Sequence, residues 1–510
     1  TTGDAGTLAL DLAVLDAAGA RQRAPIKVSL TGMGVEALDG SMGELEGERE
    51  SYGLHRALFS LNGQERFAVK PGRYAAVVSR GDAYDIARLA VTVTAGSESP
   101  LRADLRPVLD TAGMISADFH QHTVGSIDSG RTLCNRVLEN VAEGLEYAAT
   151  TDHDNVTDFM PCARSLGVTA WFNAMRGNEI SVVGVGHFNA YPLAPQAGDP
   201  FALIGAQYWA DLSAQQLFDK VRAESSMPIL HVSHPRSGSL KGYFTTLGLD
   251  PITLEGSRGT LARGWQAMEI NESFGAPADY LAAADEDMRT RARRDGSTVP
   301  AMRDWFALLS RGEAVCALGN SDTHGRNNGS GYPHNLLLVG EDRPDRVTEA
   351  MVRDAIGAQR VLVSNGLVVR IRSGGTVRMG RGALVAARGG AVDLDVEVQA
   401  APWVTVNAFT LFENGRPLAL TPDGRGGLDA ALATSAASAT LPLDMASPSR
   451  DGVVRLRATV HLRPTRDSYY VALARGASLA PVGAGDAFGY TNAVYVDTGD
   501  GAWTPPTMSP

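Results

Sequence analysis

Hydrophobic and polar residues alternate along the first hundred residues of the chain. The alternating apolar positions are Leu8, Leu10, Leu12 and Val14, and the pattern recurs over residues 26–30, 73–78 and 89–93. A period of two is typical of strands with one buried face, and turn sequences such as Asn62-Gly63 separate these segments. The pattern predicts an N-terminal β-sandwich domain over residues 1–107.

The end of the chain repeats this alternation. Val392, Leu394, Val396 and Val398 are separated by acidic residues, and further apolar strands are expected around residues 409–411 and 453–460. We therefore predict a second antiparallel β domain over residues 368–510. Neither β domain carries a cluster of His, Cys and carboxylate residues, which favours a role in packing, dimerisation or substrate shaping over catalysis.

Between the two β zones, helical patterns alternate with short apolar strands. Helices are predicted over residues 133–143, 213–224, 302–310 and 347–359, each followed by a strand over 145–149, 228–232, 314–318 or 361–363. Repetition of this unit predicts a parallel sheet closed as a barrel over residues 108–367. The fold class is therefore α/β, with the barrel flanked by the two β-sandwich domains.

Composition narrows the expected partners. The chain of 510 residues has a formal net charge of −11, which argues against a chain-wide surface for nucleic acid or an anionic membrane. The chain contains no run of 18 apolar residues, so no membrane span is predicted. We expect a small-molecule substrate, with neither nucleic acid nor membrane as a partner, and the flanking β domains offer surface for a homodimer.

Three cysteines limit the redox chemistry of the chain. Cys134, Cys162 and Cys316 are too few for a disulfide framework or a Cys-rich zinc site. At most one pair can form a disulfide, and the sequence leaves open whether Cys134 and Cys162 do so.

Histidines are concentrated in the predicted barrel. Eight of the ten lie between residues 120 and 334, and six of these eight lie in polar segments at the ends of predicted strands; the polar segments are 118–122, 151–154, 177–179, 231–235 and 321–324. Alternate residues of a strand point to one face, so His120 and His122 can reach the same ion, and Asp322 and His324 repeat that spacing. Imidazole and carboxylate ligands suit Zn, Mn or Fe, and barrel enzymes place such groups at the carboxyl ends of their strands.

These segments resemble the motifs of the PHP superfamily, named for its polymerase-associated and histidinol phosphatase members. The motifs are His120-x-His122, Thr151-Asp152-His153, His234-Pro235 and Ser321-Asp322-Thr323-His324, with Glu179 between the second and third. The resemblance covers about residues 114–366. It implies a distorted (β/α)7 barrel of the PHP type that binds several metal ions.

Further segments resemble the carbaryl-hydrolase-like CehA/McbA branch of that superfamily. They are Pro71-Gly72-Arg73-Tyr74, Ser116-Ala117-Asp118-Phe119-His120 and Phe488-Gly489-Tyr490-Thr491-Asn492. Several members of that branch are exported, and this chain begins Thr-Thr-Gly without methionine. We therefore expect a periplasmic or secreted protein, with a cytoplasmic location as the alternative.

The PHP resemblance implies a ligand set for three ions. The first ion would be held by His120, His122, Glu179 and Asp322, the second by Glu179, His187 and His234, and the third by Asp128, His153 and His324. A bridging hydroxide would be held where Glu179 and Asp322 meet. Many members have histidine at the position of Asp128, so the sequence leaves open whether two or three divalent ions bind.

Other polar residues near the motifs have different expected roles. His231 precedes His234 by three residues, so on a strand it points to the opposite face and is expected to lie in the core or behind the ligands. Asp118 and Asp152 are expected to orient ligand imidazoles. His334 is interpreted as either a substrate contact or a surface residue, and His55 and His461 as structural.

Hydrolysis is the reaction expected of such a centre, because divalent ions generate hydroxide near neutral pH and polarise the scissile group. The CehA/McbA resemblance implies a carboxylic ester or carbamate as substrate, and six aromatic residues are candidates to line an apolar pocket: Trp171, Phe172, Phe188, Tyr243, Phe244 and Tyr332. The alternative is phosphoester hydrolysis, with Arg236 and Arg326 as candidate phosphate contacts. A second alternative is a metal-binding module without turnover.

Overall fold

A computed structural model provides the structure of the chain. It describes residues 5–33, 55–194, 205–238, 241–271, 288–290, 292, 299–325, 329–435, 437–443, 452–499 and 501–506. The predicted phosphate contact Arg326 and the side chain of His55 lie outside the described residues. In the described part of the chain, no helix has both the length and the apolar character needed to cross a membrane.

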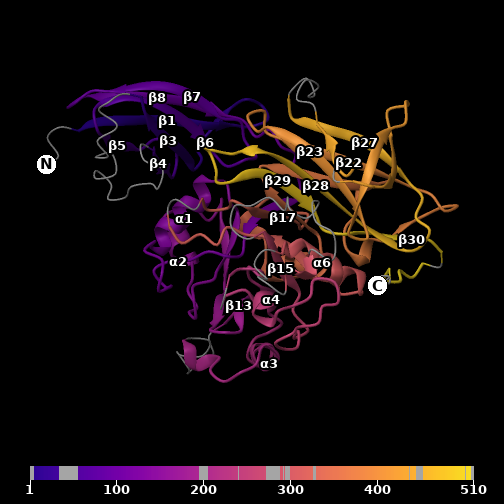
Figure 1. The fold of residues 1–510 in the computed structure, drawn as a ribbon. Helices are drawn as coiled ribbons and strands as arrows, with labels where there is room; N and C mark the ends of the chain where they lie inside the picture. Colours follow the sequence, from indigo (N-terminus) through magenta and orange to yellow (C-terminus); the bar gives the residue numbers. More distant parts are fainter. Residues whose placement is uncertain are drawn as a thin grey trace.

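The N-terminal strands form two sheets that share one core (Figure 1). The first contains β1 (Gly6–Leu15), β2 (Arg21–Gln22), β5 (Arg66–Val69) and β8 (Glu98–Leu105), and the second contains β3 (Ile26–Gly32), β4 (His55–Ser60), β6 (Gly72–Ser79) and β7 (Ala87–Val93). Leu8 and Leu12 of β1 pack in the same cluster as Ile26 and Val28 of β3. The alternating apolar residues of this zone therefore face the space between the sheets.

The middle of the chain contains, among the described residues, the four predicted helices and two further short ones. They are α1 (Leu133–Ala142), α2 (Met160–Ser165), α3 (Ala214–Glu224), α4 (Tyr243–Leu247), α6 (Ala301–Ser310) and α7 (Glu349–Gly357). Thr132 caps α1 by accepting a hydrogen bond from the backbone N–H of Asn135, and Ser213 and Gln216 form a capping box at the start of α3. The four helices predicted from the sequence are confirmed within a few residues.

The strands of the middle segment form two groups. The first contains β9 (Met114–Asp118), β10 (Tyr147–Thr150), β11 (Asn173–Arg176), β17 (His334–Leu338) and β18 (Val361–Asn365), and the second contains β12 (Asn178–Val182), β13 (Gly186–Tyr191), β14 (Ile229–Val232), β15 (Ala267–Asn271) and β16 (Cys316–Gly319). Isolated bridges join Gln121 to Thr323 and His153 to Glu179, so the two groups meet at the predicted ligand segments. The PHP-type barrel itself stays a prediction.

The predicted all-parallel sheet is only partly observed. β9, β10 and β11 are parallel, as are β14, β15 and β16. In contrast, β12 and β13 form an antiparallel hairpin, and β17 is antiparallel to both β9 and β18. The hairpin connection spans three residues, 183–185, which is too short for the helical crossover that a parallel pair requires.

The C-terminal strands continue the first of these sheets. They are β19 (Leu367–Ser373), β20 (Thr376–Val377), β21 (Val385–Ala386), β22 (Val392–Ala400), β23 (Val406–Glu413), β24 (Arg416–Pro422), β25 (Leu428–Leu432), β26 (Leu441–Pro442), β27 (Val454–Leu462), β28 (Ser468–Ser478), β29 (Asp486–Thr491) and β30 (Val494–Asp497). β18 pairs with β29, which pairs with β28, which pairs with β23. One sheet therefore crosses the boundary predicted at residue 367.

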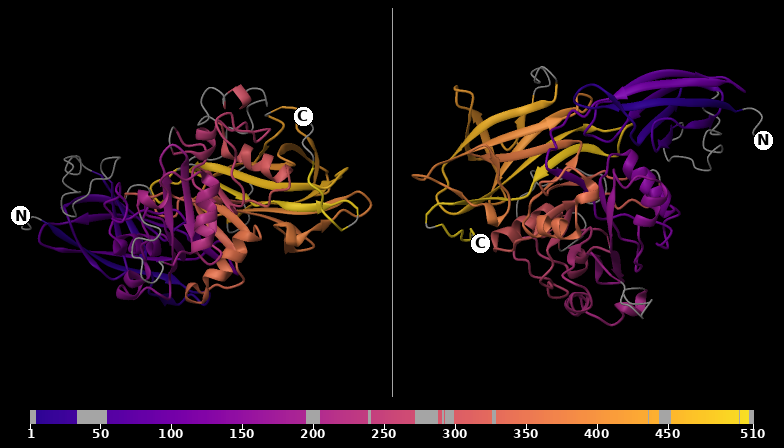
Figure 2. Two further views of the ribbon diagram at one scale, coloured as in Figure 1. Left: turned by 90° about the horizontal axis from the view of Figure 1, so that it is seen from below. Right: turned by 180° about the vertical axis from the view of Figure 1, so that it is seen from behind.

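Both β regions lie on the same side of the middle segment (Figure 2). The N-terminal region is attached by a buried ion pair in which Lys27 of β3 contacts Glu143, the residue after α1, and also the backbone carbonyl of Val482. A disulfide joins Cys134 of α1 to Cys162 of α2, and Cys316 is a buried free thiol. The disulfide that the sequence left open is thus present.

Candidate metal centre

The predicted ligands come from the ends of strands that lie far apart in the sequence. His120 and His122 follow β9, and His153 follows β10. Glu179 of β12 pairs with Asn189, and His187 of β13 pairs with Ser181, so the two ligands lie two residues apart in the register of the hairpin. His234 follows β14, and Asp322 and His324 follow β16. All nine predicted ligands, including Asp128, belong to groups whose ligand atoms lie within 4.8 Å of one another.

The first predicted group surrounds one oxygen of Asp322. Nε2 of His120 lies 3.1 Å and Nε2 of His122 lies 3.0 Å from Oδ1 of Asp322. Nε2 of His120 also lies 3.1 Å from Oε1 of Glu179. Both histidines and Glu179 are completely buried. These four side chains are the set that the PHP resemblance implies for one ion.

Glu179 connects this group with the second. Its Oε1 lies 3.2 Å from Nδ1 of His187 and 3.1 Å from Nε2 of His234. Its Oε2 lies 2.8 Å from Nδ1 of His153. Nε2 of His122 lies 3.5 Å from the same Oε2, so Glu179 is in reach of five imidazoles, as a carboxylate shared between neighbouring ions would be.

The third group lies nearer to solvent. Oδ2 of Asp128 lies 3.3 Å from Nε2 of His153 and 3.2 Å from Nε2 of His324. The Asp128 side chain is 43% exposed, in contrast to the buried Glu179. Asp128 therefore lies beside His153 and His324, on the more exposed side of the cluster.

The hydrogen bonds of His120 show which of its ring nitrogens is free to bind a metal ion. Nδ1 of His120 lies 2.8 Å from a carboxylate oxygen of Glu269, so the Nδ1 proton is donated there. In a neutral ring Nε2 then carries a lone pair, and it faces oxygens of Glu179 and Asp322 at 3.1 Å. Nε2 of His120 and Oε2 of Glu179 are buried without a hydrogen-bond partner among the described residues. Converging lone pairs at this spacing fit a divalent ion bound to nitrogen and oxygen ligands.

The pKa values of Glu179 and His120 also indicate that the cluster needs a positive charge. Burial opposes charge on Glu179, but the imidazoles of His120 and His187 outweigh burial and hold the pKa of Glu179 well below its usual value. Burial likewise opposes charge on His120, yet Asp322, Glu179 and Glu269 raise its pKa well above the ordinary value. The cluster therefore holds charged carboxylates that require a positive charge among them, supplied either by protons or by metal ions.

Two of the ligand residues have unusual backbones. His234 has a φ of 25° and Asp322 a φ of 48°, in the left-handed region that residues with a Cβ rarely adopt. Such conformations cost on the order of 1–3 kcal/mol each and are concentrated at functional sites. The fold thus holds these two side chains in place against a local preference for another conformation.

Glu269 is a functional candidate that the sequence analysis did not identify. It lies on β15, is buried, and contacts Nδ1 of His120 while its other oxygen accepts from the backbone N–H of His234 at 2.7 Å. Asn320 donates to the same carboxylate at 3.0 Å. An acidic residue within the apolar run Ala267-Met268-Glu269-Ile270 is the signal that would have indicated it.

Asp118 and Asp152 hold the ligand loops rather than the imidazoles directly. Asp118 accepts from the backbone N–H of His120 at 3.1 Å and from Oγ of Ser321 at 2.5 Å. Asp152 accepts from Ser126 Oγ at 3.1 Å, and that hydroxyl lies 2.8 Å from Nδ1 of His122. Asp152 therefore acts on the His122 ring through the Ser126 hydroxyl, whereas Asp118 binds the backbone of His120 and not its ring.

The predicted substrate contact Arg236 has a different environment. Its guanidinium is 1% exposed and forms an ion pair with Asp304 of α6, with Nε donating at 2.8 Å and an Nη at 2.5 Å. It also donates to the carbonyl of Leu249 at 2.9 Å. These bonds assign Arg236 a structural role, because its packing against α6 fixes the side chain away from the ligand cluster.

The other described histidines, His231, His334 and His461, belong to none of the ligand groups. His231 is buried between Tyr191 and Glu269, and burial lowers its pKa to about 4. His461 lies between Asp393 and Asp423 in the C-terminal sheet. His334 is 6% exposed, so the alternative of a surface residue is wrong.

A cavity of about 430 Å³ opens over the ligands. It is lined by Asp128, His153, His187, His234, Ser237, Lys241, Asp322 and His324. The six aromatic residues considered as an apolar lining do not belong to it. Five of them are buried in hydrophobic cores: Phe172, Phe188, Tyr243, Phe244 and Tyr332. The described lining is polar and charged, with Ser237 and Lys241 as new candidates for substrate contact.

Comparisons with known proteins add little. No protein-family model matches the chain, and no curated protein matches it. Among solved structures, the chain is similar to a protein from Bifidobacterium adolescentis, provisionally described as a metal-dependent phosphoesterase, with 16% identity and a TM-score of 0.24 over 47% of this chain and 95% of that one. A likeness this low carries no argument about the fold or the reaction. None of these comparisons supports the closer resemblance to the CehA/McbA branch.

Proposed function

We propose that the protein is a metal-dependent hydrolase. The observation that carries the proposal is the convergence of six histidines, two aspartates and one glutamate in groups whose ligand atoms lie within 4.8 Å of one another, with Nε2 of His120 and Oε2 of Glu179 buried without a hydrogen-bond partner among the described residues. Divalent ions bound by such a set supply Lewis acidity and a hydroxide at neutral pH. A hydrogen-bonded core would instead match each acceptor with a donor.

The residues of the chain have distinct roles in this proposal. Glu179 and Asp322 draw the imidazoles into one cluster and would hold the metal ions there. Glu269 fixes the ring of His120 by accepting its Nδ1 proton. Ser237 and Lys241 lie at the wall of the cavity, where a hydroxyl and an ammonium can bind an anionic substrate oxygen.

We propose a phosphoester as the substrate. The polar lining and Lys241 favour an anion, and divalent ions would outweigh the charge of three ligand carboxylates. A carboxylic ester or carbamate is the second candidate. Val124 and Ile127 favour it, because these exposed apolar residues lie in the loop that carries Asp128 and could contact an apolar group of the substrate.

The test is parallel turnover of p-nitrophenyl phosphate, 1-naphthyl acetate and carbaryl by the full chain, reconstituted separately with Zn and Mn. Metal content is measured on the same samples. We expect two or three ions per chain and turnover of the phosphate ester, lost in His120→Ala and retained in the control His461→Ala, which changes a histidine outside the cluster. Bound metal with no turnover of any substrate would favour a binding module, and turnover of 1-naphthyl acetate or carbaryl alone would favour the second candidate.

We also propose that the protein is exported. The support is the disulfide between Cys134 and Cys162, since such bonds persist in oxidising compartments. Fractionation of the source cells followed by immunodetection tests this: a signal confined to the cytoplasm contradicts it.

A further inference from the structure

A buried arginine of α1 connects two of the segments that carry metal ligands. Arg136 is completely buried and forms five hydrogen bonds, as many as a guanidinium has N–H donors. One Nη donates to the carbonyls of both His122 and Thr323 at 3.2 Å. Nε donates to His122 again at 3.3 Å, and the other Nη donates to the Thr323 hydroxyl at 3.1 Å and to Glu139 at 2.8 Å. Four of the five bonds therefore go to residues within the ligand segments.

The segments that Arg136 joins come from different sheets. The first follows β9, which pairs with β10 and β17, and the second follows β16, which pairs with β15. Beyond these strands, the backbones meet at the isolated bridge between Gln121 and Thr323, and the N–H of His122 donates to the carbonyl of Thr323 at 3.0 Å. The rings of His122 and His324 stack there with centroids 3.9 Å apart. The spacing of these ligands thus depends on a junction beyond the ends of the strand ladders.

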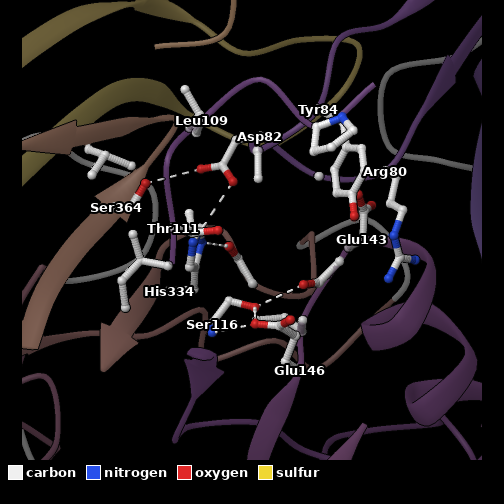
Figure 3. Close-up of a pocket in the computed structure, with 18 of the residues that line it drawn as sticks. Arg80, Asp82, Tyr84, Leu109, Thr111, Ser116, Glu143, Glu146, His334 and Ser364 are labelled. Atoms are coloured by element: carbon white, nitrogen blue, oxygen red, sulfur yellow. Dashed lines mark hydrogen bonds and ion pairs between the residues drawn. The ribbon is translucent and has the colours of Figure 1, made fainter. Parts of the chain in front are cut away.

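Helix α1 is anchored at both ends. Near its start, a disulfide joins Cys134 to Cys162 of α2. At its end, Arg80 donates to a backbone carbonyl of the helix at 2.5 Å, and Glu143 forms a buried ion pair with a lysine of β3. Arg80 and Glu143 line a cavity where the N-terminal strands meet the middle segment (Figure 3). The guanidinium of Arg136 therefore projects from a helix that other parts of the fold hold in place.

The ion pair of Arg136 does not by itself explain the residue. Glu139 is buried and also pairs with Arg131, from the loop that carries Asp128. A buried ion pair contributes little net stability, because desolvation of both charges offsets their attraction, and apolar residues of similar size could fill the same space. Apolar residues could not bind two carbonyls, whereas the planar fork of a guanidinium spans acceptors from different segments.

We propose that Arg136 is a positioning residue of the metal centre. By binding the carbonyls of His122 and Thr323 with one rigid group, it sets the distance between His122 and the ligands on either side of Thr323, which are Asp322 and His324. Nε2 of His122 lies 3.0 Å from Oδ1 of Asp322 in this arrangement. The proposal deepens the function proposed above and rests on it wherever a metal ion is involved.

Cobalt titration of the full chain tests the proposal, because the visible absorption of bound Co²⁺ depends on the geometry of its ligands. Arg136→Lys keeps a positive charge beside Glu139 but loses the fork, so cobalt affinity should fall about 10–100-fold and the spectrum should change. The matched control Arg370→Lys alters another buried arginine, which pairs with Glu397 and donates to a backbone carbonyl, and should bind cobalt as the wild type does. Wild-type affinity and spectrum in a folded Arg136→Lys would overturn the proposal.

A milder variant covers the case in which Arg136→Lys does not fold, as judged by circular dichroism. Thr323→Val removes one acceptor of the guanidinium and leaves every charged residue of the junction in place. Cobalt binding should weaken at least about twofold, which corresponds to the lower end of what one hydrogen bond contributes. Unchanged binding by Thr323→Val would then overturn the proposal.

Hydrogen exchange in the metal-free chain separates this proposal from the proposed function. In Arg136→Lys, the amides of residues 119–124 and 320–325 should exchange at least about tenfold faster than in the wild type, while Arg370→Lys should leave them unchanged. Unchanged exchange in Arg136→Lys would overturn the proposal. If the wild type binds no cobalt but exchange is faster in Arg136→Lys, the proposed metal centre is contradicted and the role of Arg136 at the junction is supported.

Discussion

Two buried glutamates show how differently this chain uses the same side chain. Glu397, in the C-terminal sheet, is surrounded by donors: Arg372 and Gln399 lie 3.1 and 2.9 Å from one oxygen, and Arg457 lies 2.6 Å from the other. Glu179 is surrounded by imidazoles and has one oxygen with no hydrogen-bond partner among the described residues. A buried carboxylate matched by fixed donors belongs to the architecture, whereas one that faces other lone pairs requires a cation.

The largest expected effect separates these two glutamates. Glu179→Gln should lower turnover by several orders of magnitude and reduce the number of bound ions, because the amide cannot bridge two cations. Glu397→Gln should lower thermal stability, since Arg372 and Arg457 lose their charged partner, but leave turnover unchanged. Metal analysis and steady-state kinetics on both variants check this. Equal loss of turnover in both would remove the distinction.

A smaller effect is expected when the support of a ligand is altered. Glu269→Gln retains the shape of the side chain but weakens its hold on the Nδ1 proton of His120, so metal affinity should fall about 10–100-fold. Competition with a chromogenic chelator measures this affinity. A matched control is Glu255→Gln, an exposed carboxylate on the same segment of the chain, which should bind metal as the wild type does.

Metal affinity should also depend on pH, because a ligand of the Glu179 cluster carries a proton that the metal ion displaces. Burial lowers the pKa of His153, but Glu179 and Asp128 outweigh it and raise the pKa to about 9 in the metal-free protein. A metal ion must displace this proton, which contributes up to about tenfold per pH unit to the rise of affinity until pH 9. Removal of the proton-binding ring in His153→Asn should reduce the slope by one proton. Equal slopes for both proteins would contradict the assignment.

The smallest effect is on stability. Metal at one hundred times its dissociation constant should stabilise the chain by about 2.7 kcal/mol, which chelation removes. For a chain of this length the melting temperature should fall by a few degrees. Scanning calorimetry with and without chelator measures the shift, and Glu397→Gln should show the same shift as the wild type. No shift in either protein would argue against a metal centre.

The ligand cluster could be predicted because its members have spacings that carry meaning. His120 and His122 lie two residues apart after an apolar strand, which orients both rings to one side before any tertiary contact is known. Glu269 has no such partner in sequence, so only the fold brings it to His120 from 149 residues away. For the same reason the sequence does not identify Lys241, which reaches the cavity from a loop.

The sequence did not predict the environment of Arg236 or the antiparallel hairpin, because tertiary packing decides both. Arg236 follows His234 closely, but its partner Asp304 comes from α6, 68 residues further along the chain. The parallel sheet was expected from alternating helices and strands, whereas β12 and β13 follow one another without a helix. Neither the ion pair nor the hairpin has a periodic signal in the sequence.

The pairing of β18 with β29 has a consequence for dissecting this protein. β18 is completely buried, and β29 is supplied by the last part of the chain. Removal of residues 368–510 would leave Val361, Leu362 and Val363 on an open sheet edge, where unpaired N–H and C=O groups recruit other strands. The segment that carries the ligand cluster therefore depends on the C-terminal strands, and truncation at the predicted boundary should yield aggregates rather than a smaller folded protein.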